Sequence, residues 1–344
     1  MASFYRVPRS ITPVFDALLI VSFGGPEGPD DVVPFLQNVT RGRSIAPERL
    51  RVVAEQYLRF GGVSPINAQC RDLIEKLTAE FTAHDVALPI YWGNRNWRPM
   101  LTDAIQQMRD DGIRRALAFI TSPYSSYSSC RQYLDDIARA RDAVGPGAPE
   151  VQRLRHYFNH PGFVEPLARN VAAALAVARD GGDVEPALLY TAHSIPTTMA
   201  QTSDYEAQLC EVARLVTEKC APSRPWSLVW QSRSGPPAVP WLEPDVGDAL
   251  DALAAAGTRS VVVAPIGFIS DHMEVVYDLD VLAAARAAAS GLRLVRAATV
   301  GSAPEFVAMI RQLVEERLDP ATPRPSLGRL GVRPECAAGC CPPR

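Results

Sequence analysis

The residues best suited to acid–base chemistry lie in two polar segments, each of which directly follows an apolar, strand-like run. Residues 188–192 lead directly into His193, and residues 261–266 lead into a polar loop that reaches Glu274. Parallel strands of an open α/β sheet end at one common crevice, so the two side chains can converge. A neutral imidazole facing a carboxylate can accept protons from a substrate or hold a divalent metal ion. A single histidine at a strand end is more often structural, but two such polar segments at equivalent strand ends favour a functional site.

A group of cysteines near the C-terminus is the second chemical feature. Cys336, Cys340 and Cys341 fall within six residues. They follow a segment, residues 319–334, that is rich in Pro, Arg and Gly and predicts a linker or an extended tail. Such a segment buries too little apolar surface to order itself, so its clustered thiols suit a soft metal centre, either zinc or iron–sulfur. Cys130 is the candidate fourth ligand, because it is predicted to open a helix whose N–H groups and dipole favour a thiolate. The alternative is a tail that binds no metal.

Alternating strand and helix patterns must position these residues. Short apolar strands followed by amphipathic helices predict an α/β fold with parallel sheets and helices on both faces. The expected strands are 15–22, 88–92, 115–121, 187–191, 227–231, 260–265 and 292–297. One helix is expected to begin near residue 30. The other expected helices cover 100–111, 130–143, 164–178, 206–219, 246–256, 274–290 and 304–318.

The pattern breaks at a turn-forming cluster, residues 144–149, and then restarts, so the two halves resemble two copies of one architecture. We therefore expect two similar Rossmann-like, doubly wound domains with the ligand cleft between them. The expected bounds are 14–160 for the first domain, 161–320 for the domain that carries His193 and Glu274, and 321–344 for the tail.

Composition limits the function classes. The 344 residues are more than twice a typical domain, which leaves room for two cores. A net charge of −3 with both signs interspersed excludes a nucleic-acid surface. No apolar run reaches the roughly 18 residues of a membrane span, and residues 1–13 lack the apolar core of a signal peptide. We expect a soluble, cytoplasmic monomer whose seven cysteines serve metal binding or catalysis rather than disulfides.

Four separate motifs resemble the signature segments of ferrochelatases, the enzymes that insert ferrous iron into a porphyrin. They are FGGVSPI at 60–66, AHSIP at 192–196, WQS at 230–232 and SDHMEVVYDLD at 270–280. The motifs occur in the family's order, and the resemblance covers the chain from Phe15 to about Leu318. The cysteine-bearing tail and the TRGR segment at 40–43 resemble the actinobacterial branch, whose substrate is coproporphyrin III.

The resemblance implies a lyase of haem biosynthesis that takes Fe2+ and coproporphyrin III as substrates and makes coproheme, which a coproheme decarboxylase can use downstream. It implies that His193 and Glu274 hold the iron and remove the two pyrrole protons, without deciding which residue does which. An ordinary imidazole pKa near 6.5 suits His193 to accept a proton at neutral pH. Asp271 and Asp278, which flank Glu274, are expected to lead the hydrated cation inward.

The resemblance also implies a [2Fe-2S] cluster, held by a C-terminal cysteine set together with one internal cysteine. The cysteines that match are Cys336, Cys340, Cys341 and a fourth ligand such as Cys130.

Substrate-binding residues are inferred from charge and position. Arg41, Arg43, Ser64 and Arg95 are candidate partners for the propionates, because a guanidinium fork fits a carboxylate bidentately. Phe23 stands where several relatives carry a tyrosine that can coordinate iron, so it offers a substrate contact and no oxygen ligand.

Three alternatives remain open at this point: a protoporphyrin IX ferrochelatase, a cobalt chelatase of the same fold, and an iron–sulfur or tetrapyrrole sensor without catalysis. The presence of both His193 and Glu274 argues against the sensor.

Overall fold

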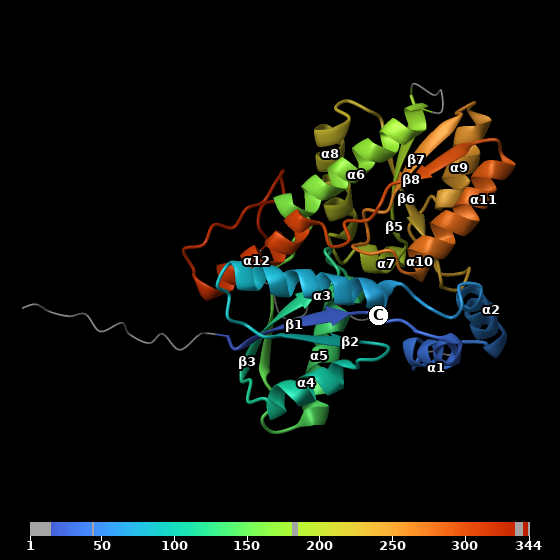
Figure 1. Ribbon diagram of the computed structural model, residues 1–344. Helices are drawn as coiled ribbons and strands as arrows, with labels where there is room; N and C mark the ends of the chain where they lie inside the picture. The colour runs from blue at the N-terminus through green and yellow to red at the C-terminus, as the bar shows by residue number, and fades with distance from the viewer. Residues whose placement is uncertain (1–14, 43–44, 181–184, 334–339, 343–344) are drawn as a thin grey trace, which may run out of the picture.

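A computed structural model of the chain describes residues 15–42, 45–180, 185–333 and 340–342. Two four-stranded parallel sheets form its framework, one in each half (Figure 1). Their strand orders, β2-β1-β3-β4 and β6-β5-β7-β8, are the same when counted from the first strand of each half. In such doubly wound sheets a crevice opens between the first and third strands, where the chain reverses its direction of winding. The prediction of two similar doubly wound halves is confirmed.

The first sheet is built around β1 (Ala17–Ser22), whose six residues are all buried. Successive side chains of a strand face opposite sides, so Leu19 packs against α4 and α5 while Leu18 joins the core on the α3 side. The other strands of this half are β2 (Ile90–Asn94), β3 (Arg115–Ile120) and β4 (Glu150–Arg153). Its helices are α1 (Pro29–Val39), α2 (Pro47–Leu58), α3 (Ile66–Ala83), α4 (Leu101–Asp110), the π-helix η1 (Tyr127–Arg131) and α5 (Gln132–Val144).

The second sheet is built around β5 (Ala187–His193), which runs two residues past its predicted end. The other strands of this half are β6 (Ser227–Gln231), β7 (Ser260–Ala264) and β8 (Arg293–Arg296). Its helices are α6 (Pro161–Asp180), α7 (Thr197–Ala200), α8 (Tyr205–Cys220), α9 (Val246–Ala255), α10 (Met273–Val275), the π-helix η2 (Val276–Ala283), α11 (Ala284–Ala289) and α12 (Pro304–Leu318).

Three elements of the first half, α2, α3 and β4, were not among those predicted. Strand β4 completes the first sheet beside β3, so the turn at 144–149 joins α5 to β4 inside this half. The predicted helix at 274–290 is continuous but contains the π-helix η2. None of the helices in the described part of the chain is long and apolar enough to cross a membrane.

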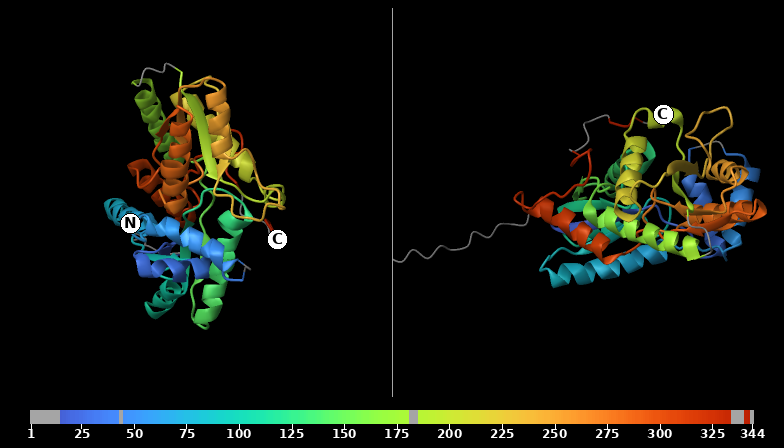
Figure 2. Two further views of the ribbon diagram at one scale, coloured as in Figure 1. Left: turned by 90° about the vertical axis from the view of Figure 1, so that its right-hand side faces the viewer. Right: turned by 90° about the horizontal axis from the view of Figure 1, so that it is seen from above.

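One buried cluster extends through both halves. Helix α12 lies along α3 and α6, so the last helix of the chain returns to the first half (Figures 1 and 2). There Phe306 packs edge-on against Phe119 and Tyr157, with ring centroids 6.1 and 5.9 Å apart. The proposed division near residue 160 therefore separates two structural repeats that share a core, and its exact bounds stay a prediction.

Residues 319–333, which follow α12, have neither helix nor strand, as expected of an extended tail, but they pack against the protein. We call these residues the strap. Leu327 donates its N–H to the carbonyl of Asn159 (2.8 Å), and the amide of Asn159 donates to Gly331 (2.8 Å). The buried Asn159 therefore helps to order a segment whose own composition supplies little apolar surface.

Candidate active site

His193 is the last residue of β5, where it pairs in register with Gln231. Its main-chain carbonyl accepts a hydrogen bond from the hydroxyl of Tyr205 (3.0 Å). Its ring Nδ1 lies 2.5 Å from the carbonyl oxygen of Ser194 and so acts as a donor. These contacts fix both the backbone and the ring, and they leave Nε2 directed toward Glu274.

Glu274 follows β7 at the start of α10. Its main-chain N–H donates to Nδ1 of His272 (3.2 Å), and its carbonyl accepts from the side-chain amide of Gln231 (2.8 Å). Its Oε1 lies 3.5 Å from Nε2 of His193. The exposed fractions of the side chains are 29% for His193 and 48% for Glu274, so the pair is open to a ligand. The structure thus brings together the two side chains that the sequence predicts to converge.

The electrostatics of the pair favour its charged form. Burial lowers the pKa of His193, but the Glu274 carboxylate, the Ser194 carbonyl and Asp278 together raise it above its ordinary value. Burial likewise opposes ionisation of Glu274, but His193 and His272 lower its pKa to about 2. Water reaches the carboxylate and screens this attraction, so the pair is poised for chemistry more than for stability.

Asp278 is the second acidic group of the site. It lies in η2, four residues after Glu274, and accepts a hydrogen bond from the hydroxyl of Ser232 (2.5 Å). Burial raises its pKa to about 6, with the charge of Glu274 adding to the effect and Ser232 opposing it. A carboxyl with that pKa exchanges protons near neutral pH. π-helical turns are rare and often mark functional positions.

Asp271 lies in a different network. Its carboxylate accepts from Nη1 of Arg296 (3.1 Å), and Nε of the same arginine pairs with Asp280 (2.5 Å). Asp271 and Asp278, predicted together as a metal path, therefore face different partners. Asp278 adjoins the His193–Glu274 pair, whereas the charge of Asp271 is balanced by Arg296.

Two residues of the first half border the site, and sequence reasoning missed both. Burial and the charges of Glu274 and Asp278 raise the pKa of Tyr57 in α2, which places its hydroxyl near those carboxylates. Gln69 of α3 exchanges two hydrogen bonds with the main chain of Asp271 (2.8 and 3.3 Å). Neither residue carries a local sequence signal, because each reaches the site only through the packing of its helix. The site lies between the two halves.

A glycine allows the loop after β7 to approach β5. Gly267 donates its N–H to the carbonyl of Thr191 (3.0 Å). A Cβ at this position would lie 2.6 Å from Cα of Ala192, the residue before His193. Because real Cβ atoms do not come this close to backbone, a larger residue would displace the end of β5 or the loop that leads to Glu274.

The predicted substrate residues are spread over the first half. Phe23 directly follows β1 and packs edge-on against Phe35, with centroids 6.3 Å apart. Arg95 is nearly buried; it forms an ion pair with Asp136 and lies over the ring of Tyr133 (4.4 Å). Ser64 is also buried, and Arg41 is exposed just after α1. Arg43 lies outside the described residues. Phe23 and Arg95 are neighbours, 5.9 Å from ring centroid to guanidinium.

The structure describes three of the four cysteines predicted to hold a cluster, Cys130, Cys340 and Cys341. Cys130, predicted to open a helix, lies instead within η1, which begins at Tyr127, and its N–H donates to the carbonyl of Ser126 (3.1 Å). Asp135 raises the pKa of Arg131, and the charges of Cys340 and Cys130 raise it further. Cys341 is buried. Cys336 lies outside the described residues, and among those that are described no three His, Cys, Asp or Glu side chains are grouped to hold a metal ion.

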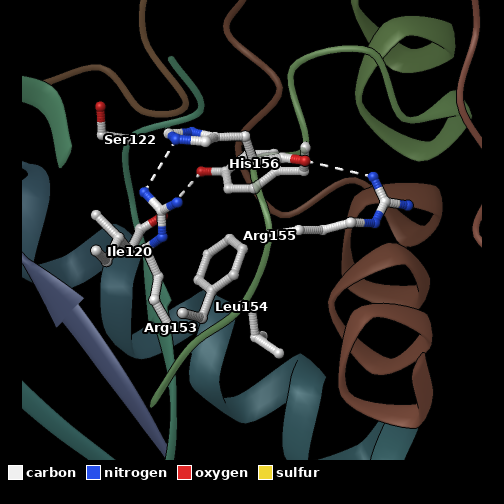
Figure 3. A pocket seen from close by; sticks show the side chains of 8 residues that line it. Ile120, Ser122, Arg153, Leu154, Arg155 and His156 are labelled. Atoms are coloured by element: carbon white, nitrogen blue, oxygen red, sulfur yellow. Dashed lines mark hydrogen bonds between the residues drawn. The ribbon is translucent and has the colours of Figure 1, made fainter. Parts of the chain in front are cut away.

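A small cavity of about 10 Å³ lies at the ends of β3 and β4 in the first sheet, just large enough for one water (Figure 3). The guanidinium of Arg153 donates to Nε2 of His156 (2.9 Å), and Nδ1 of His156 lies 3.3 Å from the carbonyl oxygen of Pro123. A larger recess of about 390 Å³ is found in the second half, lined in part by Ser194 and Trp230 beside the active-site strand ends.

The two doubly wound halves define an α/β fold with a histidine and a glutamate side by side at the strand ends of its second sheet. The solved structure of SirB from Bacillus subtilis with Fe3+ shares the fold, with a TM-score of 0.53 and 11% identity over 89% of this chain and 96% of that one. A family model described as ferrochelatase matches residues 15–318. The chain belongs to the ferrochelatase family.

Curated relatives are similar over almost the whole chain. The coproporphyrin III ferrochelatase of Frankia alni is 55% identical, with 96% of this chain and 87% of the relative covered. The coproporphyrin III ferrochelatase of Streptomyces griseus and the ferrochelatase of Rhodopirellula baltica are each 51% identical, with 96% of this chain and 94% of each relative covered.

Proposed function

We propose that this chain inserts ferrous iron into coproporphyrin III and releases coproheme and the two pyrrole protons. The observation that carries the proposal is the His193–Glu274 pair, with Nε2 and Oε1 3.5 Å apart at an edge open to solvent. The names of the Frankia and Streptomyces relatives support coproporphyrin III as the substrate. The family match supports the chemistry of iron insertion.

The three titratable groups divide the work by their charge. Glu274 stays ionised at neutral pH because its pKa is about 2, so it attracts and holds Fe2+. Above the raised pKa of His193, its neutral Nε2 accepts a pyrrole proton, and the Glu274 carboxylate stabilises the imidazolium that forms. Asp278, with a pKa of about 6, passes protons from the site to solvent. Imidazole and carboxylate are both ligands that Fe2+ accepts.

We propose further that Arg41, Arg43, Ser64 and Arg95 bind the propionates, that Phe23 packs on the macrocycle, and that Asp271 and Asp278 guide the cation. The exposed position of Arg41 supports its role. Arg95 already pairs with Asp136, so a propionate bound there would share the guanidinium with that carboxylate.

We propose that Cys130, Cys336, Cys340 and Cys341 hold a [2Fe-2S] cluster. The support is the chemistry of four thiols, which suits such a cluster, and the effect that Cys130 and Cys340 both have on the pKa of Arg131. Clustered free thiols also fit a reducing compartment, so we propose that the protein is cytoplasmic. We propose further that it is a monomer and that it passes coproheme to a decarboxylase.

The test is an anaerobic assay with Fe2+ and either coproporphyrin III or protoporphyrin IX, following the loss of the free-base porphyrin spectrum. Selective turnover of coproporphyrin III is expected. Preference for protoporphyrin IX would keep the chemistry and change the substrate, and a faster reaction with Co2+ would favour a cobalt chelatase. Tight binding of porphyrin without turnover would favour the sensor and overturn the enzyme.

A further inference from the structure

The strap ends on the first turn of α8. Nη1 of Arg333 donates to Oγ of Ser125 (2.9 Å), and Nη2 pairs with the carboxylate of Asp204, the residue that precedes α8. The N–H of Ser125 in turn donates to the side-chain oxygen of Gln208 (2.8 Å), a fully buried residue in the first turn of α8. Arg333 thus closes a ring of contacts between the loop before η1 and the start of this helix.

A second attachment holds the same helix two turns later. The N–H of Arg329 donates to Oε1 of Glu211 (2.5 Å), and Glu211 is also paired with Arg214 (2.9 Å). Asp204 and Glu211 are seven residues apart, so they lie on one face of the helix. The strap therefore contacts α8 at two points along its length.

Tyr205 connects α8 with the catalytic strand. It is the first residue of the helix, is almost fully buried, and donates its hydroxyl to the carbonyl of His193 (3.0 Å). Its ring is packed between Trp230 and Tyr124, with centroids 5.9 and 6.1 Å away. A phenol held on two sides has little freedom to adjust, so a shift of the first turn of α8 is transmitted to the backbone of His193.

We propose that the strap is a latch for the catalytic histidine: Arg333 fixes the first turn of α8, and Tyr205 transmits that position to the main chain of His193. Tyr205 is then a positioning residue for metal insertion. This inference rests on the proposed function, because it assumes that His193 reacts with the substrate. Misplacement of a reacting group by about 1 Å can cost on the order of 100-fold in rate, so a backbone anchor of this kind matters.

Hydrogen–deuterium exchange of the full-length protein tests the latch without any assay of activity. The variant is Arg333→Gln, and the matched control is Arg324→Gln, which removes the same charge from an exposed position of the same strap. We expect faster exchange in segments 203–208 and 190–197 in the first variant and unchanged exchange there in the control. Faster exchange confined to the strap and to residues 122–126 would overturn the proposal.

Steady-state kinetics test the second link. Tyr205→Phe removes the hydroxyl and keeps the ring, and the loss of one such hydrogen bond is expected to lower kcat about fivefold with the KM for porphyrin unchanged. Arg333→Gln is expected to lower kcat about twofold, because its ion pair is partly exposed, and Arg333→Lys should restore most of the loss.

The double variant distinguishes a shared route from two separate effects. Because both residues act through α8, the combined loss should be smaller than the product of the single losses. A full product, or a rise in porphyrin KM without a fall in kcat, would overturn the latch. If the wild-type protein itself lacks turnover, the proposed function fails, and the exchange experiment still decides whether the strap holds His193.

Discussion

The two sheets have the same strand order but use their carboxyl ends differently. Register pairs Ser22 with Asn94 in the first sheet and His193 with Gln231 in the second, so Ser22 and His193 occupy equivalent positions. Ser22 is fully buried and accepts a hydrogen bond from Cys70 (3.3 Å), whereas His193 is partly exposed beside an acid. The fold provides this position twice, but only in the second sheet is it occupied by a partly exposed, titratable side chain.

The largest effect should come from exchanging this equivalent pair for alanine. His193→Ala is expected to lower chelation by at least about 100-fold while porphyrin binding remains, because it removes the proton acceptor. Ser22→Ala should leave kcat unchanged and cost about 1 kcal/mol of stability, the value of one hydrogen bond. Chelation assays with thermal unfolding check both, and retained turnover in His193→Ala would refute the mechanism.

Glu274→Gln tests the charge that distinguishes the second sheet. In the wild type, Glu274 raises the pKa of His193 above its ordinary 6.5. The neutral, proton-accepting form therefore gains population as the pH rises through this raised pKa. Without the carboxylate, burial lowers the pKa, and the acid limb of the pH–rate profile should move to lower pH. The maximal rate should fall about tenfold or more, because the iron loses a ligand and general acid–base groups contribute at least that much. If the acid limb does not move, Glu274 does not control the pKa of the group that titrates there.

A smaller effect on kcat is expected for Gln231, at the end of the neighbouring strand β6. Gln231 donates to the carbonyl of Glu274 (2.8 Å), and the equivalent Asn94 donates to the carbonyl of Arg98 (3.1 Å). Gln231→Ala should lower kcat several-fold by releasing Glu274, whereas Asn94→Ala should spare kcat and cost about 1–3 kcal/mol by leaving buried polar groups unpaired. Comparing kcat with the free energy of unfolding for both variants separates the two roles. Equal losses of kcat would remove the distinction between the sheets.

The two π-helices extend the comparison to the cysteines. η2 carries Asp278 of the active site, and η1 carries Cys130. Deleting the chain after Arg333 should eliminate visible iron–sulfur absorption, and Cys130→Ser should do the same if this cysteine is the fourth ligand. Cys210→Ser, at an exposed position on α8, is the control and should keep the absorption. Persistence of the spectrum in the truncated protein would rule out the tail as a source of ligands.

Much of the framework was predictable from the sequence, because buried parallel strands form apolar runs that end at recognisable turns. Strand β4 was not, since it is an edge strand without a fully buried residue. Helix α2 was missed for a similar reason: only Ala54 is buried, so its amphipathic pattern is weak. The hydrophobic pattern of the sequence therefore reveals a helix or strand only where several of its residues are buried.

The same limit applies to the site. The convergence of His193 and Glu274 follows from the geometry of parallel strand ends, and their apolar runs identify those ends. Three other residues reach the site only through the packing of helices and hydrogen bonds between distant parts of the chain: Tyr57, Gln69 and Tyr205. No local sequence pattern encodes such contacts. The order of the strap was not predictable from its composition for the same reason, since it depends on contacts with distant residues, among them Asn159 and Glu211.

The position of α12 bears on how the chain is made. Phe306, near its start, fills a space among Phe119, Tyr157 and Phe163 that these three rings cannot close alone. A ribosome releases the chain from its N-terminus, so the first half emerges with this aromatic surface open to water. The shared core can close only after nearly the whole chain has been synthesised, and both halves should then gain and lose their structure together.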